Sequence, residues 1–286
     1  MRKALLLICL LSAVPALAAE TKLRLLTIGG TISEIVCALD RCADIIATDS
    51  SSRYPAELGR LPQVGYARSL SAEGVLAQNP DLIILGDEAG PPAALEQLRR
   101  SGKKILEISA RPDLAAARER ILHISQALGQ EVQGREMLAR LDADLERLNE
   151  QRKTLKQRPK VLFVYARGHR SLLIAGNETA ASTLIELAGA ENAVHGFKGF
   201  KTLTPEAVVA AEPEVILMVE GGVASLGGPE ALWSLPGLAM TPAYAKRRLI
   251  RMDDLLLLGM GPRLGQAALE LLQKWPSSES ARVKGK

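Results

Sequence analysis

The chain has 286 residues, of which 47% are hydrophobic and 24% charged, and 36 basic residues against 32 acidic ones give a formal net charge of +4. A chain of this length and apolar content can bury the cores of two lobes of ordinary domain size. The charge surplus is small and includes no long block of Lys and Arg, which argues against nucleic acid as a partner.

The N-terminus has the pattern of a secretory signal. Arg2 and Lys3 precede a mostly apolar run over residues 4–17, and Ala16-Leu17-Ala18 has the small-x-small form of a signal-peptidase site. The run is too short to span a membrane as a helix. We therefore predict a signal peptide over residues 1–18 and export of the rest of the chain.

Export leaves Cys37 and Cys42 in a compartment where disulfides form. They are close in sequence, so a bond between them requires the first helix to end near Leu39 and Cys42 to turn back. The alternatives are two buried thiols or a metal-binding pair, but no His or further Cys lies nearby in the sequence to complete a metal site. We favour a disulfide between Cys37 and Cys42.

The first part of the chain alternates short apolar runs with helical patterns. The apolar runs predict strands at residues 23–28, 44–48, 81–85 and 104–108, and the helical patterns begin at Thr31 or cover residues 71–78 and 92–101. Residues 49–62, rich in Ser and Pro, are predicted as a surface loop. Strands alternating with helices form parallel sheets covered on both faces, so residues 19–128 are expected to form an N-terminal α/β lobe.

No strand pattern interrupts residues 113–157, where leucines recur at helical spacing with charges between them. Gly129 divides this stretch into two predicted helices. The second, over residues 131–156, would be about 39 Å long at a rise of 1.5 Å per residue, which is long enough to connect two lobes. Pro159 then stops it. Residues 129–158 are thus predicted as a connecting helix.

The remainder repeats the pattern, with a predicted strand at 160–165, a loop at 167–177 and a helix at 179–187. An internal match supports a second lobe over residues 159–275, followed by a flexible tail over 276–286. Residues 70–85 align without gaps with residues 203–218, and Glu73 corresponds to Glu206. Both glutamates fall in the first turn of a predicted helix, where the helix dipole favours a negative charge. Tyr66, by contrast, aligns with Gly199.

Tyr66 and Arg68 stand out just before the first copy of this repeat. In an extended segment, residues two apart leave the backbone on the same side, so the phenol and the guanidinium are expected to share one pocket. The structural alternative is a tyrosine packed under a loop and an arginine paired with a surface carboxylate.

Taken together, the export signal, the two α/β halves, the long helix and the paired Leu-x-x-Glu helices resemble periplasmic substrate-binding proteins that serve ABC importers for iron complexes and cobalamin. Three blocks are similar to the haem-binding members of that class: residues 64–74, residues 166–169 with 175–176, and residues 259–263. The resemblance implies an α/β fold of two Rossmann-like lobes joined by a single long α-helix, with the ligand cleft between the lobes.

The resemblance also implies roles for single residues. Tyr66 would be the axial ligand of ferric haem, which suits a hard phenolate oxygen. A free phenol has a pKa of about 10, so a nearby cation such as Arg68 would help to hold the phenolate. His169 would be a candidate ligand from the opposite wall. Candidates for the haem propionates are Arg167, Arg170, Lys198 and Lys201, for which solvated loop charges are the alternative. We interpret His123 as a packing residue and His195 as a surface residue.

Glu73 and Glu206 would dock on an ABC permease dimer in the inner membrane, one from each lobe, unless they only stabilise their helices. The predicted function is therefore the periplasmic binding of haem and its delivery to that permease, with an outer-membrane haem uptake system as a further partner. A carrier for a ferric siderophore or cobalamin remains open on the same scaffold. An exported hydrolase is disfavoured, because the chain has no Gly-x-Ser-x-Gly elbow and no paired carboxylates near His169.

Overall fold

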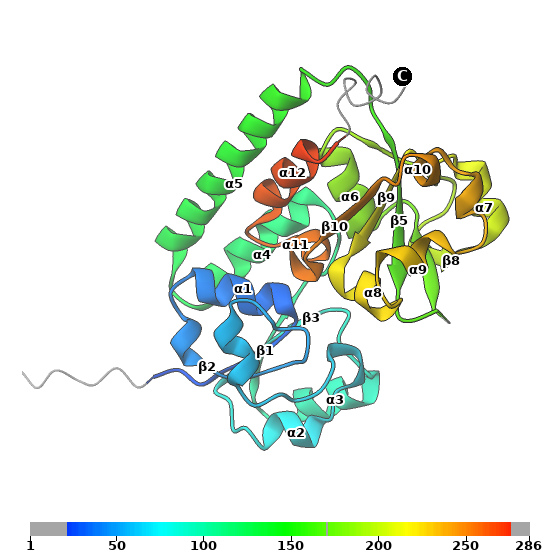
Figure 1. Ribbon diagram of the computed structural model, residues 1–286. Coiled ribbons are helices and arrows are strands. Elements are labelled where there is room, and N and C mark those ends of the chain that lie inside the picture. The colour runs from blue at the N-terminus through cyan, green and yellow to red at the C-terminus, as the bar shows by residue number, and fades with distance from the viewer. Residues whose placement is uncertain (1–21, 170, 276–286) are drawn as a thin grey trace, which may run out of the picture.

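The computed structural model describes residues 22–169 and 171–275, so the predicted signal peptide and C-terminal tail lie outside the described residues. The chain folds into two α/β lobes, with the N-terminal one in blue and cyan and the C-terminal one in green to orange (Figure 1). The predicted fold class is confirmed. Within the described ranges, no helix is both long and apolar enough to cross a membrane.

The sheet of the N-terminal lobe is entirely parallel, as the alternating pattern predicts. Its strands lie in the order β2-β1-β3-β4. Their bounds are β1 Leu25–Ile28, β2 Ile45–Thr48, β3 Leu82–Gly86 and β4 Lys104–Ile108. The helices that cover this sheet or continue from it are α1 Gly30–Ala38, α2 Ala72–Leu76, α3 Pro92–Arg100 and α4 Leu114–Ala127. Each predicted strand and helix of this lobe is present, and three short 3-10 turns lie between them: Cys42–Asp44, Ala56–Arg60 and Ala67–Ser69.

The sheet of the C-terminal lobe is mixed, and here the sequence prediction is wrong in one place. Its order is β10-β9-β5-β6-β8, with β7 also paired to β5. The strands are β5 Lys160–Ala166, β6 Leu172–Ala175, β7 Glu191–Asn192, β8 Phe200–Thr202, β9 Val215–Val219 and β10 Leu249–Met252. Part of the predicted loop at 167–177 is therefore strand β6, which runs antiparallel to β5 and β8. Its apolar residues pack against the lobe core, and the chain reverses through Gly168 at a φ of 69°.

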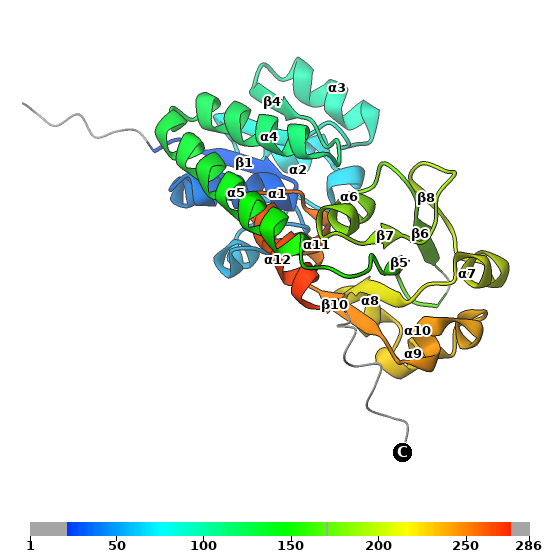
Figure 2. The ribbon, with the colours of Figure 1, turned by 90° about the horizontal axis from the view of Figure 1, so that it is seen from above.

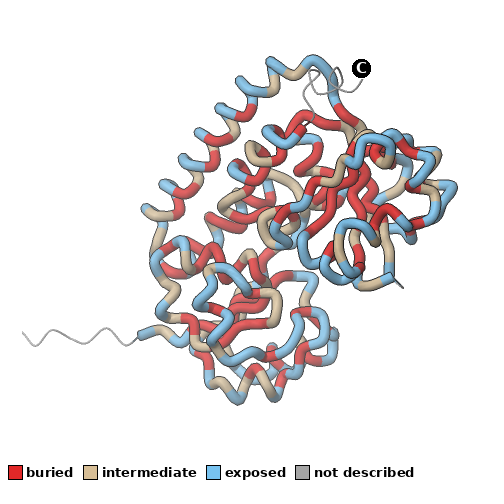
Figure 3. The backbone as a smooth tube through the Cα atoms, in the orientation of Figure 1, coloured by how far each residue is buried: buried red, intermediate tan, exposed pale blue. Residues whose placement is uncertain are grey.

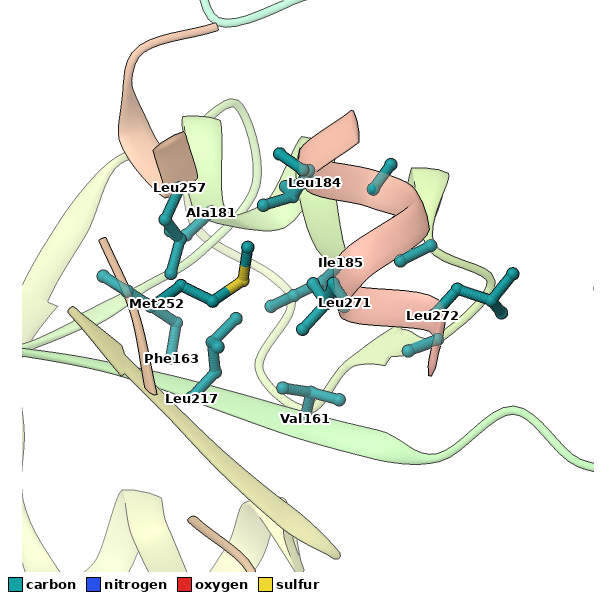
Figure 4. Packing of buried hydrophobic residues seen from close by; sticks show 14 of the residues in the cluster. Val161, Phe163, Ala181, Leu184, Ile185, Leu217, Met252, Leu257, Leu271 and Leu272 are labelled. Atoms are coloured by element: carbon teal, nitrogen blue, oxygen red, sulfur yellow. The ribbon is translucent and has the colours of Figure 1, made fainter. Parts of the chain in front are cut away.

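The remaining helices of this half are α6 Ala180–Leu187, α7 Pro205–Ala211, α8 Glu220–Ser225, α9 Pro229–Trp233, α10 Pro242–Ala245, α11 Asp254–Leu258 and α12 Leu264–Gln273, with a 3-10 turn at Leu238–Met240. Strand β9 is buried along its whole length, as expected for a strand covered on both faces. Figure 4 shows the core on one face of this sheet, where Phe163 of β5, Leu217 of β9 and Ile185 of α6 meet.

Helix α5, Glu131–Arg152, runs along the outside of the molecule (Figure 1). It packs against α4 and α12, and Figure 2 shows it beside both. Figure 3 shows buried residues on its inner side and exposed residues on its outer side. Met137 joins the core of the N-terminal lobe, whereas Leu141 and Leu148 join that of the C-terminal lobe. One amphipathic helix thus contributes to both cores, as its leucine spacing predicts.

The end of this helix differs from the prediction. α5 stops at Arg152 instead of continuing to Lys156, so its 22 residues span about 33 Å. The following residues form turns, in which the amides of Thr154 and Leu155 donate to the carbonyls of Gln151 and Arg152. The chain therefore leaves the helix well before Pro159.

The internal repeat is visible in matching local structure. Ser71 and Thr204 each cap a helix, accepting a hydrogen bond from the amide three residues later. Asn79 and Glu212, equivalent in the repeat, have φ angles of 48° and 45°. The carboxylates that follow, Asp81 and Glu214, are equivalent too: Asp81 accepts from the amide of Arg24 at 2.9 Å and Glu214 from that of Lys160 at 3.1 Å. Each carboxylate binds the backbone at the start of a neighbouring strand.

A disulfide joins Cys37 and Cys42, at the C-terminal end of α1. Helix α1 ends at Ala38, and the 3-10 turn Cys42–Asp44 brings the second cysteine back toward the first. Cys37 and Cys42 also pack against the apolar core of the N-terminal lobe, so the bond closes a small loop between α1 and β2.

Candidate functional site

A cleft with a volume of about 1040 Å³ lies between the two lobes. The N-terminal wall consists of residues that follow β1, β2, β3 and β4, and the C-terminal wall of residues that follow or end β5, β9 and β10. Ligand sites of open α/β sheets lie outside the carboxyl ends of the strands. Both sheets direct those ends to the same cleft, which makes it the candidate site.

In the N-terminal wall, a buried carboxylate binds the turn at Gly29 and the loop that follows β2. Asp49 Oδ1 accepts hydrogen bonds from the amide of Gly29 and the hydroxyl of Ser52, both at 2.9 Å, and Oδ2 accepts from the amide of Ser51 at 3.1 Å. A Cβ at Gly30 would lie 2.6 Å from the carbonyl oxygen of Ser51. Only glycine therefore allows the two loops to approach so closely.

The segment that carries Tyr66 is held at both of its ends. The amide of Ser50 donates to the carbonyl of Gly65 at 2.8 Å, and the amide of Gly90 donates to the carbonyl of Ala67 at 2.9 Å. Ala67 is buried, whereas the side chain of Tyr66 is 36% exposed and lines the cleft. The backbone thus presents the phenol to the cleft from a fixed segment of the N-terminal lobe.

Tyr66 and Arg68 both line the cleft, so the expectation that they share one pocket is confirmed, although the backbone between them is not extended. Ala67–Ser69 is a 3-10 turn, in which residues two apart do not share a side. Along the described parts of the chain, no hydrogen bond joins Arg68 to Tyr66. The cation that lies against the Tyr66 ring is Arg167, whose Cζ atom is 5.6 Å from the ring centroid. The two side chains therefore share the pocket, but from a turn rather than from the extended segment that the spacing argument assumed.

Arg167 comes from the C-terminal wall, where it also binds Tyr165. Its Nε donates to the Tyr165 hydroxyl at 2.9 Å, and its Cζ is 5.6 Å from the Tyr165 ring centroid. The pKa of Arg167 is raised, first by the hydrogen bond to Tyr165 and next by the Tyr66 phenol. The Tyr165 ring packs at 6.1 Å against Phe200 of β8. Arg167 therefore connects a phenol of each lobe.

Sequence reasoning did not single out Tyr165, although a signal was present. The tripeptide Tyr-Ala-Arg occurs at residues 66–68 and again at 165–167, and all four of the polar residues in these tripeptides line the cleft. The two copies are not equivalent in the internal repeat, so a search restricted to the repeat register passes over the second.

The other predicted polar residues of the second wall lie differently. His169 is exposed in the turn between β5 and β6, and it is not among the residues that line the cleft. Lys198 forms an ion pair with Glu178 at 2.6 Å, and Lys201 lies 4.6 Å from the Phe197 ring centroid. Arg170 lies outside the described residues. Of the three propionate candidates that the structure describes, Arg167 lines the cleft and Lys198 and Lys201 do not.

The two remaining histidines lie on the surface. His123 is exposed on α4, so its interpretation as a packing residue is wrong, because the buried face of that helix is formed by other side chains. His195 is exposed, as predicted, with its Nε2 at 3.7 Å from a carboxylate oxygen of Glu191.

Buried polar contacts join the two lobes behind the cleft. Glu34 of α1 forms an ion pair with Arg263, whose Nε and Nη2 lie 2.5 Å and 3.2 Å from its two carboxylate oxygens. Burial raises the pKa of Glu34, and the hydrogen bond from Arg263 partly offsets that effect. The Arg263 guanidinium also stacks on Tyr54, with Cζ 3.7 Å from the ring centroid. Sequence reasoning had noted residues 259–263 only as a family block.

Two further hydrogen bonds hold the segment before Arg263. Thr31 Oγ1 donates to the carbonyl of Gly259 at 2.7 Å, and Arg120 Nη1 donates to that of Met260 at 2.8 Å. Arg120 is 5% exposed, and burial is the main reason that its pKa is lowered. The segment over residues 259–263 is thus attached to the N-terminal lobe, which restricts relative motion of the lobes.

Glu73 and Glu206 are not among the residues that line the cleft; they lie in the first turns of α2 and α7. Both side chains are exposed. Val75 and Val208 occupy equivalent positions in the two copies of the repeat. Both are fully buried and anchor these helices. Each lobe therefore presents one carboxylate from an equivalent position.

The lining of the cleft combines apolar, charged and phenolic side chains. Its apolar members include Ile32, Ile108, Val219, Leu258 and Met260, of which Leu258 is partly exposed and the other four are buried. Its arginines, Arg53, Arg68, Arg120 and Arg167, outnumber its acidic residues Glu88, Asp253 and Asp254. Of those acids, Asp253 caps α11 and Asp254 accepts from the amide of Gly221. Tyr54, Tyr66 and Tyr165 add three phenols to the lining.

The chain belongs to the periplasmic binding protein family, whose model matches residues 26–256. Its members are binding proteins, which agrees with a cleft shaped for a ligand.

The chain is similar to solved structures of that fold. It is 41% identical to the periplasmic heme-binding protein RhuT from Roseiflexus sp. RS-1, with a TM-score of 0.86 over 88% of this chain and 97% of that one. It is 33% identical to a periplasmic heme-binding protein from Pseudomonas aeruginosa, with a TM-score of 0.79 over 87% and 91% of the two chains. It is also 24% identical to the vitamin B12-binding protein of Pectobacterium atrosepticum, over 87% of this chain and 86% of that protein.

Proposed function

We propose that the protein is a periplasmic carrier that binds ferric haem in the interlobe cleft and delivers it to an ABC permease dimer in the inner membrane. The observation that carries the proposal is the Tyr66 phenol on the cleft wall, with the Arg167 guanidinium against its ring. A phenolate is a hard anionic donor for Fe(III), and tyrosine is an established haem ligand. The similarity to heme-binding proteins of at least 33% identity supports it.

The cleft residues fit haem as cargo in three respects. The apolar lining residues would cover the faces of the macrocycle, and Tyr66 would bind the iron. Arg53, Arg68 and Arg167 would pair with the propionates or with the phenolate, because a guanidinium forms charge-assisted hydrogen bonds with both kinds of anion. His169 remains a candidate ligand only if the turn between β5 and β6 moves toward the cleft.

The test is a titration of the purified protein with hemin, followed by absorbance. The wild-type protein should give a shifted Soret band and a phenolate-to-iron charge-transfer band. Tyr66→Phe keeps the ring but removes the ligand oxygen, so it should weaken the Tyr66-dependent binding at least about tenfold, or about 1.4 kcal/mol. Tyr244→Phe is the matched control, because Tyr244 lies outside the cleft and packs against Trp233. A Tyr66→Phe protein with unchanged affinity and spectrum would contradict the assignment.

Cobalamin is the second candidate ligand, because the chain is also similar to a vitamin B12-binding protein, at lower identity. A competition titration separates the two ligands. We expect cyanocobalamin in excess to leave the hemin spectrum unchanged, whereas displacement of hemin would favour the cobalamin carrier. If the apo-protein binds a ferric siderophore but no hemin, the protein is a siderophore carrier, which is the third candidate function.

The docking step of the proposal rests on Glu73 and Glu206. Each is exposed at the start of an equivalent helix, one in each lobe, so a permease of two similar subunits can engage both through arginines. The secretory signal predicted for residues 1–18 places the carrier in the same compartment as the outer face of such a permease. An outer-membrane haem uptake system would supply the cargo.

A further inference from the structure

The guanidinium of Arg167 lies against aromatic rings at the cleft. Its Nε donates to the Tyr165 hydroxyl at 2.9 Å, and its Cζ is 5.6 Å from the ring centroids of both Tyr66 and Tyr165. Arg167 is exposed and directly follows the last residue of β5. Because an arginine side chain is long and has many rotamers, the place of its guanidinium also depends on how firmly the backbone beneath it is held.

The backbone on both sides of Arg167 lies against one hydroxyl, that of Ser225 in α8. Ser225 Oγ accepts a hydrogen bond from the amide of Gly168 at 2.9 Å. Its O–H is within hydrogen-bond distance of two carbonyls, that of Gly222 at 2.7 Å and that of Ala166 at 3.3 Å. Ala166 and Gly168 are the sequence neighbours of Arg167. One side chain therefore contacts the chain immediately before and immediately after Arg167.

This contact comes from outside the hairpin that carries Arg167. Within the hairpin, the amide of Arg167 donates to the carbonyl of Ser171 at 3.0 Å. Gly168 has a φ of 69°, so the chain begins to reverse directly after Arg167. The hydrogen bond from the Gly168 amide to Ser225 attaches that reversal to α8.

Helix α8 is itself anchored beside the cleft. Asp254 Oδ2 accepts a hydrogen bond from the amide of Gly221 at 3.0 Å, and Val223 is buried in the core of the lobe. A Cβ at Gly221 would lie 2.9 Å from Asp254 Oδ1, so the carboxylate and the first turn of the helix are in close contact. Ser225 and Asp254 both line the cleft, which places these anchoring contacts next to the ligand site.

We infer that Ser225 is a positioning residue for the ligand site, whose hydroxyl holds the backbone of Arg167 so that the guanidinium lies against Tyr66. The inference rests on the proposed function, in which Tyr66 binds the iron and Arg167 pairs with an anion at the site. Ser225 acts without touching the haem, because its hydroxyl bonds the protein backbone. Its contribution to haem binding passes through Arg167.

The first test compares Ser225→Ala with Ser225→Thr in hemin titrations. Alanine removes the hydrogen bond to the Gly168 amide, whereas threonine keeps the hydroxyl at an exposed position. The loss of one hydrogen bond should weaken hemin binding by Ser225→Ala about two- to tenfold, and Ser225→Thr should bind hemin as the wild type does. Equal losses in the two variants, or no loss in Ser225→Ala, would overturn the inference.

A double-mutant cycle tests whether the effect passes through Arg167. In the Arg167→Met background, Ser225→Ala should cause no further loss of hemin affinity. Each single variant should also shift the phenolate-to-iron charge-transfer band in the same direction, because each moves or removes the cation beside Tyr66. Additive losses of affinity would show that Ser225 acts independently of Arg167, and they would overturn the inference.

Ser109→Ala is the matched control. Ser109 also lines the cleft, and its hydroxyl also accepts from a backbone amide, that of Arg111 at 3.3 Å, but it follows β4 on the N-terminal wall. This variant should bind hemin as the wild type does. A loss equal to that of Ser225→Ala would show that removal of any such cleft hydroxyl weakens binding, which would contradict a specific role for Ser225.

Failure of this inference is distinguishable from failure of the proposed function. A wild type that binds hemin through Tyr66, with a Ser225→Ala variant identical to it, retains the haem carrier and rejects the role of Ser225. A wild type that binds no hemin rejects both.

Discussion

Arg167 lies against a phenol on each wall of the cleft, Tyr66 and Tyr165, so its removal should weaken ligand binding. Arg167→Met keeps much of the side-chain volume but removes the charge and its N–H donors. Hydrogen bonds to charged groups contribute about 1.5–3 kcal/mol, so hemin affinity should fall about tenfold or more. Hemin titration at constant ionic strength measures the loss.

Arg68→Met is the matched control for that experiment. Arg68 also lines the cleft, but no hydrogen bond joins it to Tyr66 across the described residues. Its replacement should cost less affinity than that of Arg167. A larger loss of hemin affinity in Arg68→Met than in Arg167→Met would mean that Arg68 is the partner of the phenolate, as the sequence spacing indicates.

Glu34 gives the protein a pH dependence of defined sign. Burial raises its pKa above the ordinary value of 4.5, in spite of the hydrogen bond from Arg263. The folded state therefore holds this proton more tightly than the unfolded state does. The stability that Glu34 contributes is fully present below pH 4.5 and is lost as pH rises through the raised folded pKa.

Glu34→Gln isolates this effect, because the other carboxylates titrate equally in both proteins. Urea unfolding at a series of pH values upward from 4.5 should show the free energy of unfolding of the wild type falling relative to that of Glu34→Gln. A difference that instead grows with pH would mean that the ion pair with Arg263 outweighs burial and lowers the pKa of Glu34.

Single residues could be predicted where the signal is local. Tyr66 was found because it stands in a distinctive block, and Cys37 and Cys42 because so few residues separate them. The partners of these residues could not be found in that way. The contact of Arg167 with Tyr66, and that of Arg263 with Glu34, join residues about 100 and 229 positions apart. Only the fold brings them together.

At the scale of elements, α5 tests whether one helix stabilises both cores. Leu141 is fully buried in the C-terminal core, so Leu141→Ala should lower the free energy of unfolding by about 2–5 kcal/mol through lost burial and the cavity that remains. Val132→Ala, on the same helix at 57% exposure, should change it by no more than about 0.5 kcal/mol. Denaturant unfolding measures both, and equal effects would contradict the assigned orientation of the helix.

The elements themselves were predictable where periodicity is strong. The strands of the N-terminal lobe and the start of α5 follow from apolar runs and leucine spacing. Strand β6 was missed because residues 172–175 are few and follow a polar turn, so their apolar character reads as part of a loop. The helix end was misplaced because Leu155 continues the leucine spacing, although the chain already turns at Thr154.

At the scale of the whole molecule, the internal repeat relates structural features of the two lobes but does not relate the two walls of the ligand cleft. Caps, left-handed residues and backbone-binding carboxylates recur in register between the lobes, as the sequence alignment indicates. The phenols do not: Tyr66 precedes the 3-10 turn before α2, whereas Tyr165 is the last residue but one of β5. The alignment therefore predicted the equivalent surfaces of the lobes but could not predict the second wall of the cleft.

The equivalent surfaces carry the prediction about transport. Glu73→Lys combined with Glu206→Lys reverses one exposed charge on each lobe at the start of α2 and α7. The two lysines would repel the permease arginines that the two glutamates attract. Delivery of haem to reconstituted permease should therefore fall at least about tenfold. Hemin affinity should be unchanged, because neither glutamate lines the cleft.

Glu136→Lys with Glu146→Lys is the control, since it makes the same change in net charge on the exposed face of α5. That variant should deliver haem as the wild type does. If both double variants lose delivery equally, long-range charge rather than docking at the two glutamates governs the encounter. Raising the salt concentration then distinguishes the cases further, because screening over a Debye length of about 8–10 Å should restore a long-range effect more than it restores a direct contact between opposed charges.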